Sequence, residues 1–304
     1  ARGDLDSSVR VIRSRDEIGR LSRSFENMRR ELKNYIANLA TVTAVRERME
    51  SELKIARQIQ MSYLPRHFPV WSQEHPVEIF ARLEPALEIG GDCYDFFFLE
   101  NGKIFLEVGD VSGKGVPAAI FMAITKSLIK GIAEMGMGPA EVLTRVNREL
   151  AVDNDLTMFM TVICGVLDLR TGRFEYTNGG HLRPWVVRKG QPPFALELPP
   201  CNVLAAFEES EYVSREVMLE DEDMLVFYSD GVTEAMNRKR ELMGNEQLQE
   251  VVTRNPKASP AQMVAAIFEA VNKHADGANQ HDDITVFAVR YRKTPPSVDS
   301  RPKA

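Results

Sequence analysis

Apolar residues near the start of the chain recur at alternating steps of three and four, from residue 18 to residue 42. This spacing predicts a long helix with one apolar seam, as in a parallel coiled-coil dimer. The pattern falters at Val45 and Arg46 and resumes at Met49, which indicates a local shift of register. The segment is therefore either a plain coiled-coil spacer or a signalling helix whose register carries information. The seam consists of Ile18, Leu21, Phe25, Met28, Leu32, Tyr35, Leu39 and Val42.

The pattern changes after Pro65, the first proline of the chain. Short runs of β-branched and aromatic residues then alternate with turn signals, of which Asn101-Gly102 is the strongest. Helical spacing appears between these runs, with proline at or near the start of each helix. Hairpins mixed with helices predict an α+β fold in which helices cover antiparallel sheets. The expected strands are residues 77–83, 93–100, 103–108, 160–169, 173–177, 185–189, 211–219, 224–228 and 284–290, and the expected helices begin at residues 117, 139 and 260.

The 304 residues carry a net charge of −6, which is unevenly distributed. Residues 1–60 hold 13 Lys and Arg against 9 Asp and Glu, whereas the rest of the chain holds 25 against 35. This surplus of acids beyond residue 60 argues against binding of nucleic acid, because a phosphate backbone attracts the opposite charge. The same surplus is compatible with sites for divalent cations.

The three cysteines, Cys93, Cys164 and Cys201, are scattered, and none forms a CxxC pair. This usage predicts neither a disulfide framework nor a zinc site, and it fits a reducing cytoplasm. The longest nearly apolar run, residues 116–124, is far shorter than a membrane span, and no signal peptide is recognisable. We therefore expect this segment to be soluble.

Four acidic residues stand beside glycine or a turn at the edge of a β-rich run. A carboxylate at a strand end is held rigidly, and an adjacent glycine lets a carbonyl or an ion approach closely. Any one of these acids could be only a turn residue, but four in one chain favour a metal site. Mg²⁺ and Mn²⁺ prefer oxygen ligands, and two such ions can activate a bridging water for attack on a phosphoester. The four acids are Asp92, Asp110, Asp230 and Asp282.

Five motifs occur in the order GGDCYD, VGDVSGKG, TNGGH, YSDGVTE and DDITVF. This ordered set resembles the SpoIIE/RsbU family of bacterial phosphatases, a branch of the metal-dependent PPM serine/threonine phosphatases. The resemblance covers about residues 50–291, and residues 52–65 look like the helix that leads into the domain. Residues 15–28, RDEIGRLSRSFENM, resemble the C-terminal half of a HAMP relay domain, which implies a parent receptor with transmembrane helices.

The resemblance implies a four-layer α-β-β-α sandwich of two antiparallel sheets flanked by helices, preceded by an N-terminal coiled-coil helix. This agrees with the run of hairpins described above. The domain boundaries expected from it are a partial HAMP domain at 1–34, a coiled-coil signalling linker at 35–66, a phosphatase domain at 67–291 and a disordered tail at 292–304.

Matching the motifs residue by residue implies a centre of two Mn²⁺ or Mg²⁺ ions. Asp110 would bridge both ions, and the carbonyl of Val111 would bind one of them. Two further carboxylates would complete the shell of the second ion, and a third would hold metal-bound water. These are Asp230 and Asp282 for the second ion and Asp92 for the water.

The chain departs from the family pattern in its third and last motifs. The wider superfamily ends on Asp-Asn where this chain has Asp282-Asp283, and we favour Asp282 as the ligand. The third motif usually reads Asn-Ala-Gly-His, whereas this chain has TNGGH. His181 in that motif is either a proton donor to the leaving group or a structural residue that fixes a turn, and we favour the structural role.

The group that binds the substrate phosphate is not identified by the motifs. Many eukaryotic members hold an arginine upstream of the first acidic motif, and Arg82 is the nearest candidate here. Lys114, between two glycines, suggests a P-loop, but the full GxxxxGK[ST] spacing is absent.

The expected function is hydrolysis of phosphoserine or phosphothreonine on a partner protein, by resemblance a STAS-type anti-sigma-factor antagonist. The alternative is a catalytically silent signalling scaffold, which the intact acids argue against, while a two-metal nuclease fits poorly with the acidic charge. We expect a homodimer through residues 18–64, whose rotation or register shift is transmitted through residues 52–65 to Asp92 and Asp110. The parent protein is expected to be an inner-membrane receptor with this part in the cytoplasm.

Overall fold

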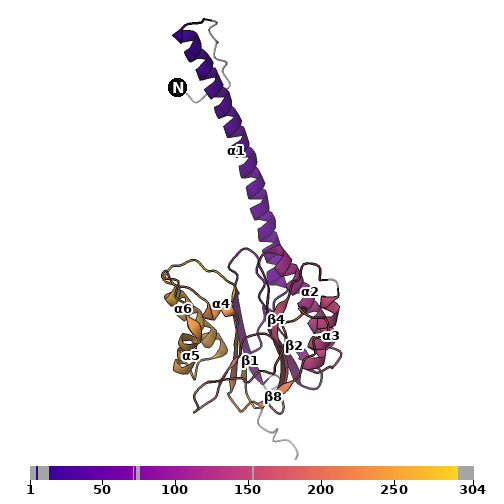
Figure 1. The fold of residues 1–304 in the computed structure, drawn as a ribbon. Helices are drawn as coiled ribbons and strands as arrows, with labels where there is room; N and C mark the ends of the chain where they lie inside the picture. The colour runs from indigo at the N-terminus through magenta and orange to yellow at the C-terminus, as the bar shows by residue number, and fades with distance from the viewer. Residues whose placement is uncertain (1–4, 6–13, 71, 73–75, 153, 294–304) are drawn as a thin grey trace, which may run out of the picture. The chain divides into compact units, whose positions relative to one another are not determined.

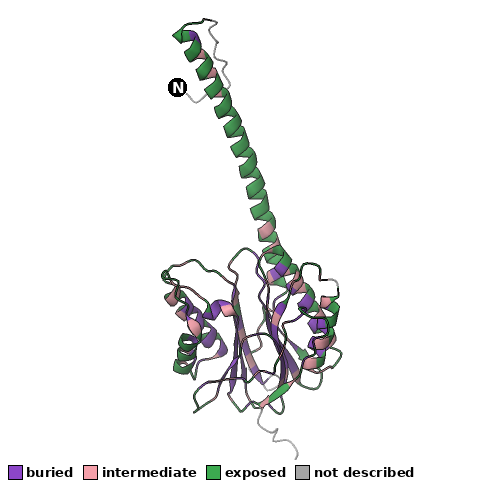
Figure 2. Ribbon diagram, in the orientation of Figure 1, coloured by how far each residue is buried: buried purple, intermediate pink, exposed green. Residues whose placement is uncertain are grey.

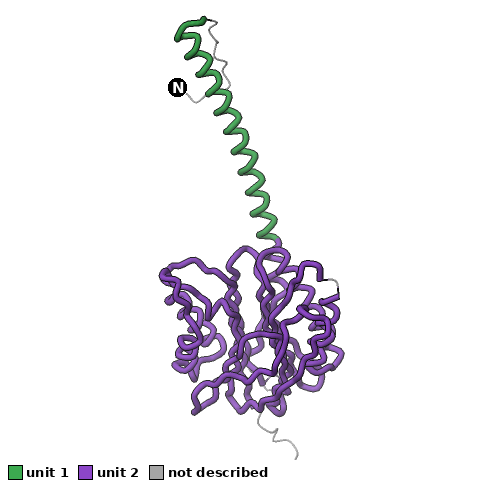
Figure 3. Tube along the Cα trace, viewed as in Figure 1, with its two compact units in different colours: residues 1–55 green, residues 56–304 purple. Residues whose placement is uncertain are grey.

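The structure is a computed structural model that describes residues 5, 14–70, 72, 76–152 and 154–293. The chain divides into two compact units, residues 1–55 and residues 56–304 (Figure 3). The tail that we expected to be disordered lies outside the described residues from residue 294 onward. Much of the expected HAMP segment before residue 14 also lies outside them.

The first unit consists mainly of a single long helix, α1 (Glu17–Ser62), whose last residues belong to the second unit. The Asp16 carboxylate accepts a hydrogen bond from the Gly19 N–H at 3.0 Å and so caps the first turn. Farther along, an exposed ion pair joins Arg46 to Glu50 at 2.7 Å, one turn apart. The predicted long helix is confirmed, and it continues without interruption where the apolar pattern falters.

The predicted seam of α1 is exposed in the first unit (Figure 2). Leu21 is 71% exposed and Val42 is 64% exposed, and the other seam residues are comparable. A single helix in water gains no burial from such a row of side chains, so the seam offers a surface for a partner helix.

The second unit contains two five-stranded sheets, in which every neighbouring pair of strands is antiparallel (Figure 1). The first sheet has the order β1 (Val77–Glu84), β10 (Ile284–Tyr291), β9 (Met224–Tyr228), β6 (Trp185–Val187) and β7 (Phe194–Ala195). The second sheet has the order β2 (Cys93–Leu99), β3 (Lys103–Val111), β4 (Met160–Asp168), β5 (Arg173–Gly179) and β8 (Arg215–Met218).

Helices cover the outer faces of both sheets (Figure 1). The pair α2 (Val116–Ala133) and α3 (Pro139–Ala151) lies on the second sheet. On the first sheet α6 (Pro260–Ala275) packs against β1 and β10, with α5 (Gly244–Arg254) beside it and the short α4 (Asp230–Thr233) nearby. The predicted four-layer α-β-β-α sandwich is therefore confirmed.

Aromatic side chains join the two sheets across the central layer. Phe174 of β5 meets Phe227 of β9 edge to face, with 6.4 Å between the ring centroids. At the other side Tyr94 of β2 stacks on Phe287 of β10 at 5.9 Å. Because Phe174, Phe227 and Phe287 are at most 2% exposed, burial of these rings fixes the spacing of the sheets.

The β2–β3 hairpin places two of the candidate acids at one end of its sheet. Its three-residue loop, 100–102, contains Asn101 and Gly102 with φ of 61° and 71°, left-handed values that asparagine and glycine tolerate best. The resulting register pairs Cys93 with Gly109. Asp92 and Asp110 therefore lie together at the far end of the hairpin.

Some elements differ from the expectation. The strand expected over residues 211–219 is limited to β8, because the Tyr212 N–H before it donates to Thr144 Oγ1 of α3 at 3.2 Å and so ties that stretch to a helix. The helix α5 and the two-residue strand β7 were not predicted.

The helix α2 is, among the described residues, the one helix long and apolar enough to cross a membrane by length and composition alone. Its Met122 and Ile129 are fully buried, and the helix packs against α3 and β3. Core helices of folded domains meet the same criterion; one face of α2 is buried in this way, whereas Ile120 and Ile124 on it are 56% and 49% exposed.

Candidate active site

The four candidate acids come from the same end of both sheets. Asp92 directly precedes β2, and Asp110 is the second-last residue of the neighbouring β3. On the other sheet Asp230 begins α4 just after β9, and Asp282 lies in the loop before β10. Antiparallel pairing places the end of β9 beside the start of β10, so the four acids gather where the two sheets meet.

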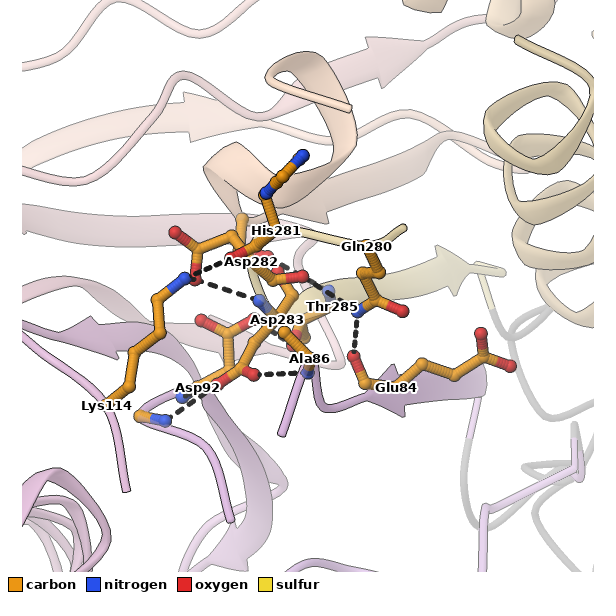
Figure 4. A network of polar contacts seen from close by, with 11 residues as sticks. Glu84, Ala86, Asp92, Lys114, Gln280, His281, Asp282, Asp283 and Thr285 are labelled. Carbon is orange, nitrogen blue, oxygen red and sulfur yellow. Dashed lines mark hydrogen bonds and ion pairs between the residues drawn. The ribbon is translucent and has the colours of Figure 1, made fainter. Parts of the chain in front are cut away.

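Asp92 is the most deeply buried of the four, at 2% exposed. Its Oδ2 atom accepts a hydrogen bond from Thr285 Oγ1 of β10 at 2.5 Å, which links the two sheets (Figure 4). Its Oδ1 atom is also buried but receives no hydrogen bond from a hydroxyl or N–H group. The pKa of Asp92 lies well above its usual range, because burial disfavours the charge and Asp110 adds a second negative charge.

The other carboxylates repel one another. Burial, together with the charges of Asp230 and Asp282, raises the pKa of Asp110 to about 7. The pKa of Asp230 is likewise raised, first by burial and then by Asp282. Groups that shift each other in this way lie close together, and their repulsion is relieved by a proton or by a cation.

Glycines beside the acids leave room that a side chain would fill. A Cβ atom on Gly91 would lie 2.7 Å from the carbonyl oxygen of Val111 and 3.4 Å from Asp110 Oδ1. A Cβ atom on Gly231, directly after Asp230, would lie 2.0 Å from the carbonyl oxygen of Asp283. The GGD and SDG motifs thus require glycine for close approach of the chain segments that carry the acids.

The structure separates the roles of Asp282 and Asp283. Asp283 is 4% exposed, and its carboxylate accepts hydrogen bonds from the backbone N–H groups of Ala86 at 2.8 Å and Gly91 at 2.7 Å. It therefore holds the loop before Asp92 in place (Figure 4). The Asp282 side chain is 36% exposed and contributes to the raised pKa of Asp110, which places it with the other candidate acids.

Lys114 is a member of the site that the sequence reasoning did not assign. Its Nζ atom lies 3.0 Å from Asp282 Oδ1 and also donates to the carbonyl oxygen of His281 (Figure 4). The signal that could have found it is its place three residues after Val111, in the loop between β3 and α2.

His181 lies beneath the site rather than in it. The side chain is 6% exposed, and its Nδ1 atom is 2.9 Å from Thr161 Oγ1, on the β4 residue that pairs with Asp110. The backbone N–H of His181 donates to Asn178 Oδ1 at 3.1 Å. Burial lowers the pKa of His181 to about 4, so the ring is neutral at pH 7 and poorly suited to donate a proton.

Arg82, the nearest arginine to the first acidic motif, is engaged elsewhere. Its guanidinium lies 4.2 Å from the centre of the Phe268 ring on α6 and forms an ion pair with Glu84. These contacts direct it to the helix that covers the first sheet.

The donor set fits a hard divalent cation. Within the described part of the chain, no three His, Cys, Asp or Glu side chains close on one point as ligands of a single ion. Mg²⁺ and Mn²⁺ need fewer protein ligands, because one or two carboxylates and a carbonyl are completed by water. The Asp92 Oδ1 atom without a partner among the described residues, the close approach of Gly91 to the Val111 carbonyl and Asp110, and the mutual repulsion of the acids all suit such an ion.

Family models match two parts of the chain. The model described as Stage II sporulation protein E (SpoIIE) matches residues 100–292, and the HAMP domain model matches residues 1–34.

Two relatives are 30% identical in sequence. Protein IcfG of Synechocystis sp. aligns over 95% of this chain and 49% of its own length, so the chain spans about half of IcfG. Phosphoserine phosphatase RsbU of Bacillus subtilis aligns over 82% of this chain and 73% of its own length.

Two solved structures share the fold. The SiaA-PP2C domain of Pseudomonas aeruginosa superposes with a TM-score of 0.72 at 19% identity, over 82% of this chain and 99% of that domain. A crystal structure of RsbX in complex with magnesium gives a TM-score of 0.56 at 16% identity, over 74% of this chain and 100% of RsbX.

Proposed function

The chain belongs to the SpoIIE family and carries a PP2C-type serine/threonine phosphatase domain, and we propose that it dephosphorylates a partner protein in response to its N-terminal helices. The observation that carries this proposal is the group of four acids at the meeting point of the sheets, where Asp230 and Asp282 raise the pKa of Asp110 to about 7. An acid whose pKa is shifted by burial and by specific charged neighbours is typical of a functional site.

We assign the acids to a centre of two divalent ions, as phosphatases of this family are metal-dependent. Asp110 and the Val111 carbonyl would hold one ion, and Asp110 would also serve as a ligand of the second. Ions bound there activate water for attack on a phosphoester and stabilise negative charge on its oxygens. RsbX, a structural neighbour, was crystallised with magnesium. For the second ion we propose Asp230 and Asp282 beside the shared Asp110, with Asp92 holding water; because no three acidic side chains of the described residues close on one point, these side chains would have to draw together when the ion binds.

The chain itself supplies rigidity at this centre. Thr285 holds one oxygen of Asp92 and leaves the other open. Asp283 fixes the preceding loop through the N–H groups of Ala86 and Gly91. A site whose side chains are already oriented loses little free energy to reorganisation when substrate arrives.

The proposed substrate is phosphoserine or phosphothreonine on a STAS-type anti-sigma-factor antagonist. The support is the relative RsbU, which is named a phosphoserine phosphatase. The acidic surplus beyond residue 60 also disfavours a nucleic-acid substrate.

Regulation is proposed to act through a parallel homodimer of α1. The exposed seam of the first unit supports it, because pairing with a second copy would bury a continuous apolar row. Sedimentation of the full chain over a range of concentrations measures the dimer. A species that stays monomeric at high concentration while fully active would contradict this part of the proposal.

The end of α1 within the second unit provides the proposed route to the acids. The Gln60 side chain is 8% exposed and forms two hydrogen bonds with the backbone of Gly90. Its Nε2 donates to the Gly90 carbonyl oxygen at 2.6 Å, and its Oε1 accepts from the Gly90 N–H at 3.2 Å. Gly90 precedes Gly91 and Asp92, so a movement of Gln60 would displace the loop on which both sit. Two helix packings that differ by a few kcal/mol would then change occupancy of the site.

The HAMP match suggests a membrane-associated receptor, and we propose that residues 1–304 are the cytoplasmic part of such a receptor, in an inner membrane. The upstream segments would then supply the signal that α1 relays.

Hydrolysis assays test the catalytic proposal. The full chain is incubated with p-nitrophenyl phosphate, and separately with a serine-phosphorylated STAS domain, in Mn²⁺, Mg²⁺ or EDTA. We expect phosphate release that needs the metal and is lost in Asp110→Ala. If neither substrate is hydrolysed while the STAS domain still binds, the chain is a scaffold instead.

A further inference from the structure

Lys114 reaches across the candidate active site from one sheet to the other. It lies in the loop between β3 and α2, and its ammonium contacts Asp282 and the carbonyl oxygen of His281, both in the loop before β10. Both side chains of the Lys114–Asp282 pair are 36% exposed, so the pair is partly shielded from water and from salt.

The loop that carries Lys114 is held at its base. Ser112 donates its N–H to the carbonyl oxygen of Phe159 at 2.8 Å, and the Phe159 N–H donates back to Ser112 Oγ at 3.0 Å. Gly113 and Gly115, on either side of Lys114, have φ of 83° and 80°, which favour glycine. The chain therefore turns sharply at Lys114, and the backbone position of this residue is fixed.

The Lys114 ammonium supplies positive charge where a bound metal ion would supply it. It has donors only and carries a compact charge, so it neutralises a carboxylate as a small ion would. Its charge also lowers the pKa of Asp230, against the larger effects of burial and of Asp282. Among the described residues, no other Lys, Arg or His forms an ion pair with the four candidate acids.

We infer that Lys114 competes with a divalent ion for Asp282 and thereby lowers the metal affinity of the site. This inference rests on the metal centre proposed above. The Asp282 oxygen that accepts from Lys114 is not free to bind an ion, and an ion beside it would repel the ammonium. An ion that binds Asp282 Oδ1 would therefore displace Lys114, and one at the other oxygen would be repelled by the nearby ammonium, so either way the lysine costs metal affinity.

The Lys114→Gln variant tests the competition by calorimetry. Titration of Mn²⁺ into the metal-free full chain gives the dissociation constant without reference to hydrolysis. Because one partly shielded ion pair is broken on loading, we expect Lys114→Gln to bind Mn²⁺ about tenfold more tightly than the wild type. The conservative Lys114→Arg variant keeps the charge and should stay within about threefold of the wild type.

Two controls separate competition from a general effect of charge. Lys189 is exposed in the turn after β6, whose last residue pairs with the first residue of β9, at the opposite end from Asp230. Lys189→Gln removes the same charge there and should leave the affinity unchanged. In an Asp282→Asn background, addition of Lys114→Gln should no longer tighten binding, because the contested carboxylate is gone.

The outcomes distinguish this inference from the proposed function. Equal or weaker Mn²⁺ binding by Lys114→Gln, or equal tightening by Lys189→Gln, overturns the competition while leaving the phosphatase proposal intact. Absence of Mn²⁺ binding in the wild type and in Lys114→Gln overturns both. Tighter binding in Lys114→Gln without hydrolysis of any phosphoprotein supports the competition and overturns the proposed substrate.

Discussion

Two groups of buried or half-buried acids in the second unit differ in how their negative charge is balanced. The strand-end cluster is the set Asp92, Asp110, Asp230 and Asp282. The sheet-face cluster is Asp95, Glu107 and Lys126, on the face of the second sheet that α2 covers. Asp92 and Asp95 are only three residues apart in sequence, yet each belongs to a different cluster.

The sheet-face cluster contains its own cation. Lys126 of α2 forms an ion pair with Asp95 of β2, and both side chains are less than 10% exposed. Glu107 of β3 stands opposite Asp95 in the ladder and is 2% exposed. Burial, and then the charge of Asp95, raises the pKa of Glu107 well above its usual range, which favours its protonated form. With Glu107 protonated, Lys126 and Asp95 balance each other without any ligand.

The strand-end cluster has four acids and only the partly exposed Lys114 as a counter-ion in the described part of the chain. Burial and mutual repulsion raise the pKa of Asp92 and of Asp110, and among the described residues Asp92 Oδ1 has no donor. The comparison teaches that buried acids alone do not indicate a metal site. What distinguishes the functional cluster is that the chain supplies too little positive charge, so that a bound cation completes it.

The largest expected effect is on catalysis through the strand-end cluster. Asp110→Asn keeps the shape of the side chain but removes the charge that two ions would share. We expect a loss of hydrolysis on the order of 10³-fold, as for removal of a group that stabilises transition-state charge. The rate of phosphate release from a phosphoprotein in Mn²⁺ measures it. The matched control is Asp168→Asn, outside both clusters. Full activity of Asp110→Asn would show that the strand-end cluster has no catalytic role that the sheet-face cluster lacks.

The next effect is on stability through the sheet-face cluster. Lys126→Met leaves Asp95 buried without its cation, which costs about 3–5 kcal/mol of unfolding free energy. Urea unfolding measures this loss. Lys130→Met is the matched control, since Lys130 is exposed on the same helix and lies 5.3 Å from the Phe97 ring, and it should cost less than about 1 kcal/mol. Equal losses of unfolding free energy in the two variants would show that the buried Lys126–Asp95 ion pair contributes no more than the exposed Lys130.

A third prediction concerns the metal-free protein and its pH. Asp110 has a pKa of about 7 in the folded state against 3.8 as a reference, so the folded state binds more protons between those values. Stability therefore falls as pH rises from about 4 to 7, and it stays low above pH 7. Asp110→Asn removes this loss, so it should stabilise the protein in EDTA by about 2 kcal/mol at pH 8 and by little near pH 4.

Unfolding in EDTA at several pH values measures this difference. Asp168→Asn gives the opposite sign as a control. Although partial burial opposes them, hydrogen bonds from the N–H groups of Arg170 and Thr171 lower the pKa of Asp168, so its charge is stabilising at pH 8. If Asp110→Asn were destabilising at pH 8, the repulsion within the strand-end cluster would be refuted.

The sequence predicted the architecture well because its signals were local. The Asn101-Gly102 signal between two β-rich runs indicates the hairpin of β2 and β3, and a short loop of this kind sets its register. The heptad spacing likewise determined α1. The short β7 and the limits of β8 could not be predicted, because the contact between Tyr212 and Thr144 depends on tertiary packing.

For the site, the motifs located the acids but not the groups that act on them. The four acids lie together because the two sheets meet at that point. The motifs predicted this only through their resemblance to a known family. The anchoring role of Asp283 and the ion pair of Lys114 depend on contacts between segments more than 160 residues apart. No pattern within one segment carries that information.

The smallest expected effect decides which acid of the sheet-face cluster carries the charge. Because burial raises the pKa of Glu107 and so favours its protonated form, Glu107→Gln replaces that form by a neutral group of similar shape and should change stability by less than about 1 kcal/mol near pH 5. The sign depends on pH: unfolding releases the proton of Glu107 above its reference pKa of 4.5, so the wild type loses stability relative to Glu107→Gln as pH rises. Asp95→Asn is the contrast, because it leaves Lys126 buried without a partner and should cost about 3 kcal/mol. Urea unfolding at pH 5 and pH 8 measures both variants, and a large loss in Glu107→Gln with little in Asp95→Asn would assign the charge to Glu107 instead.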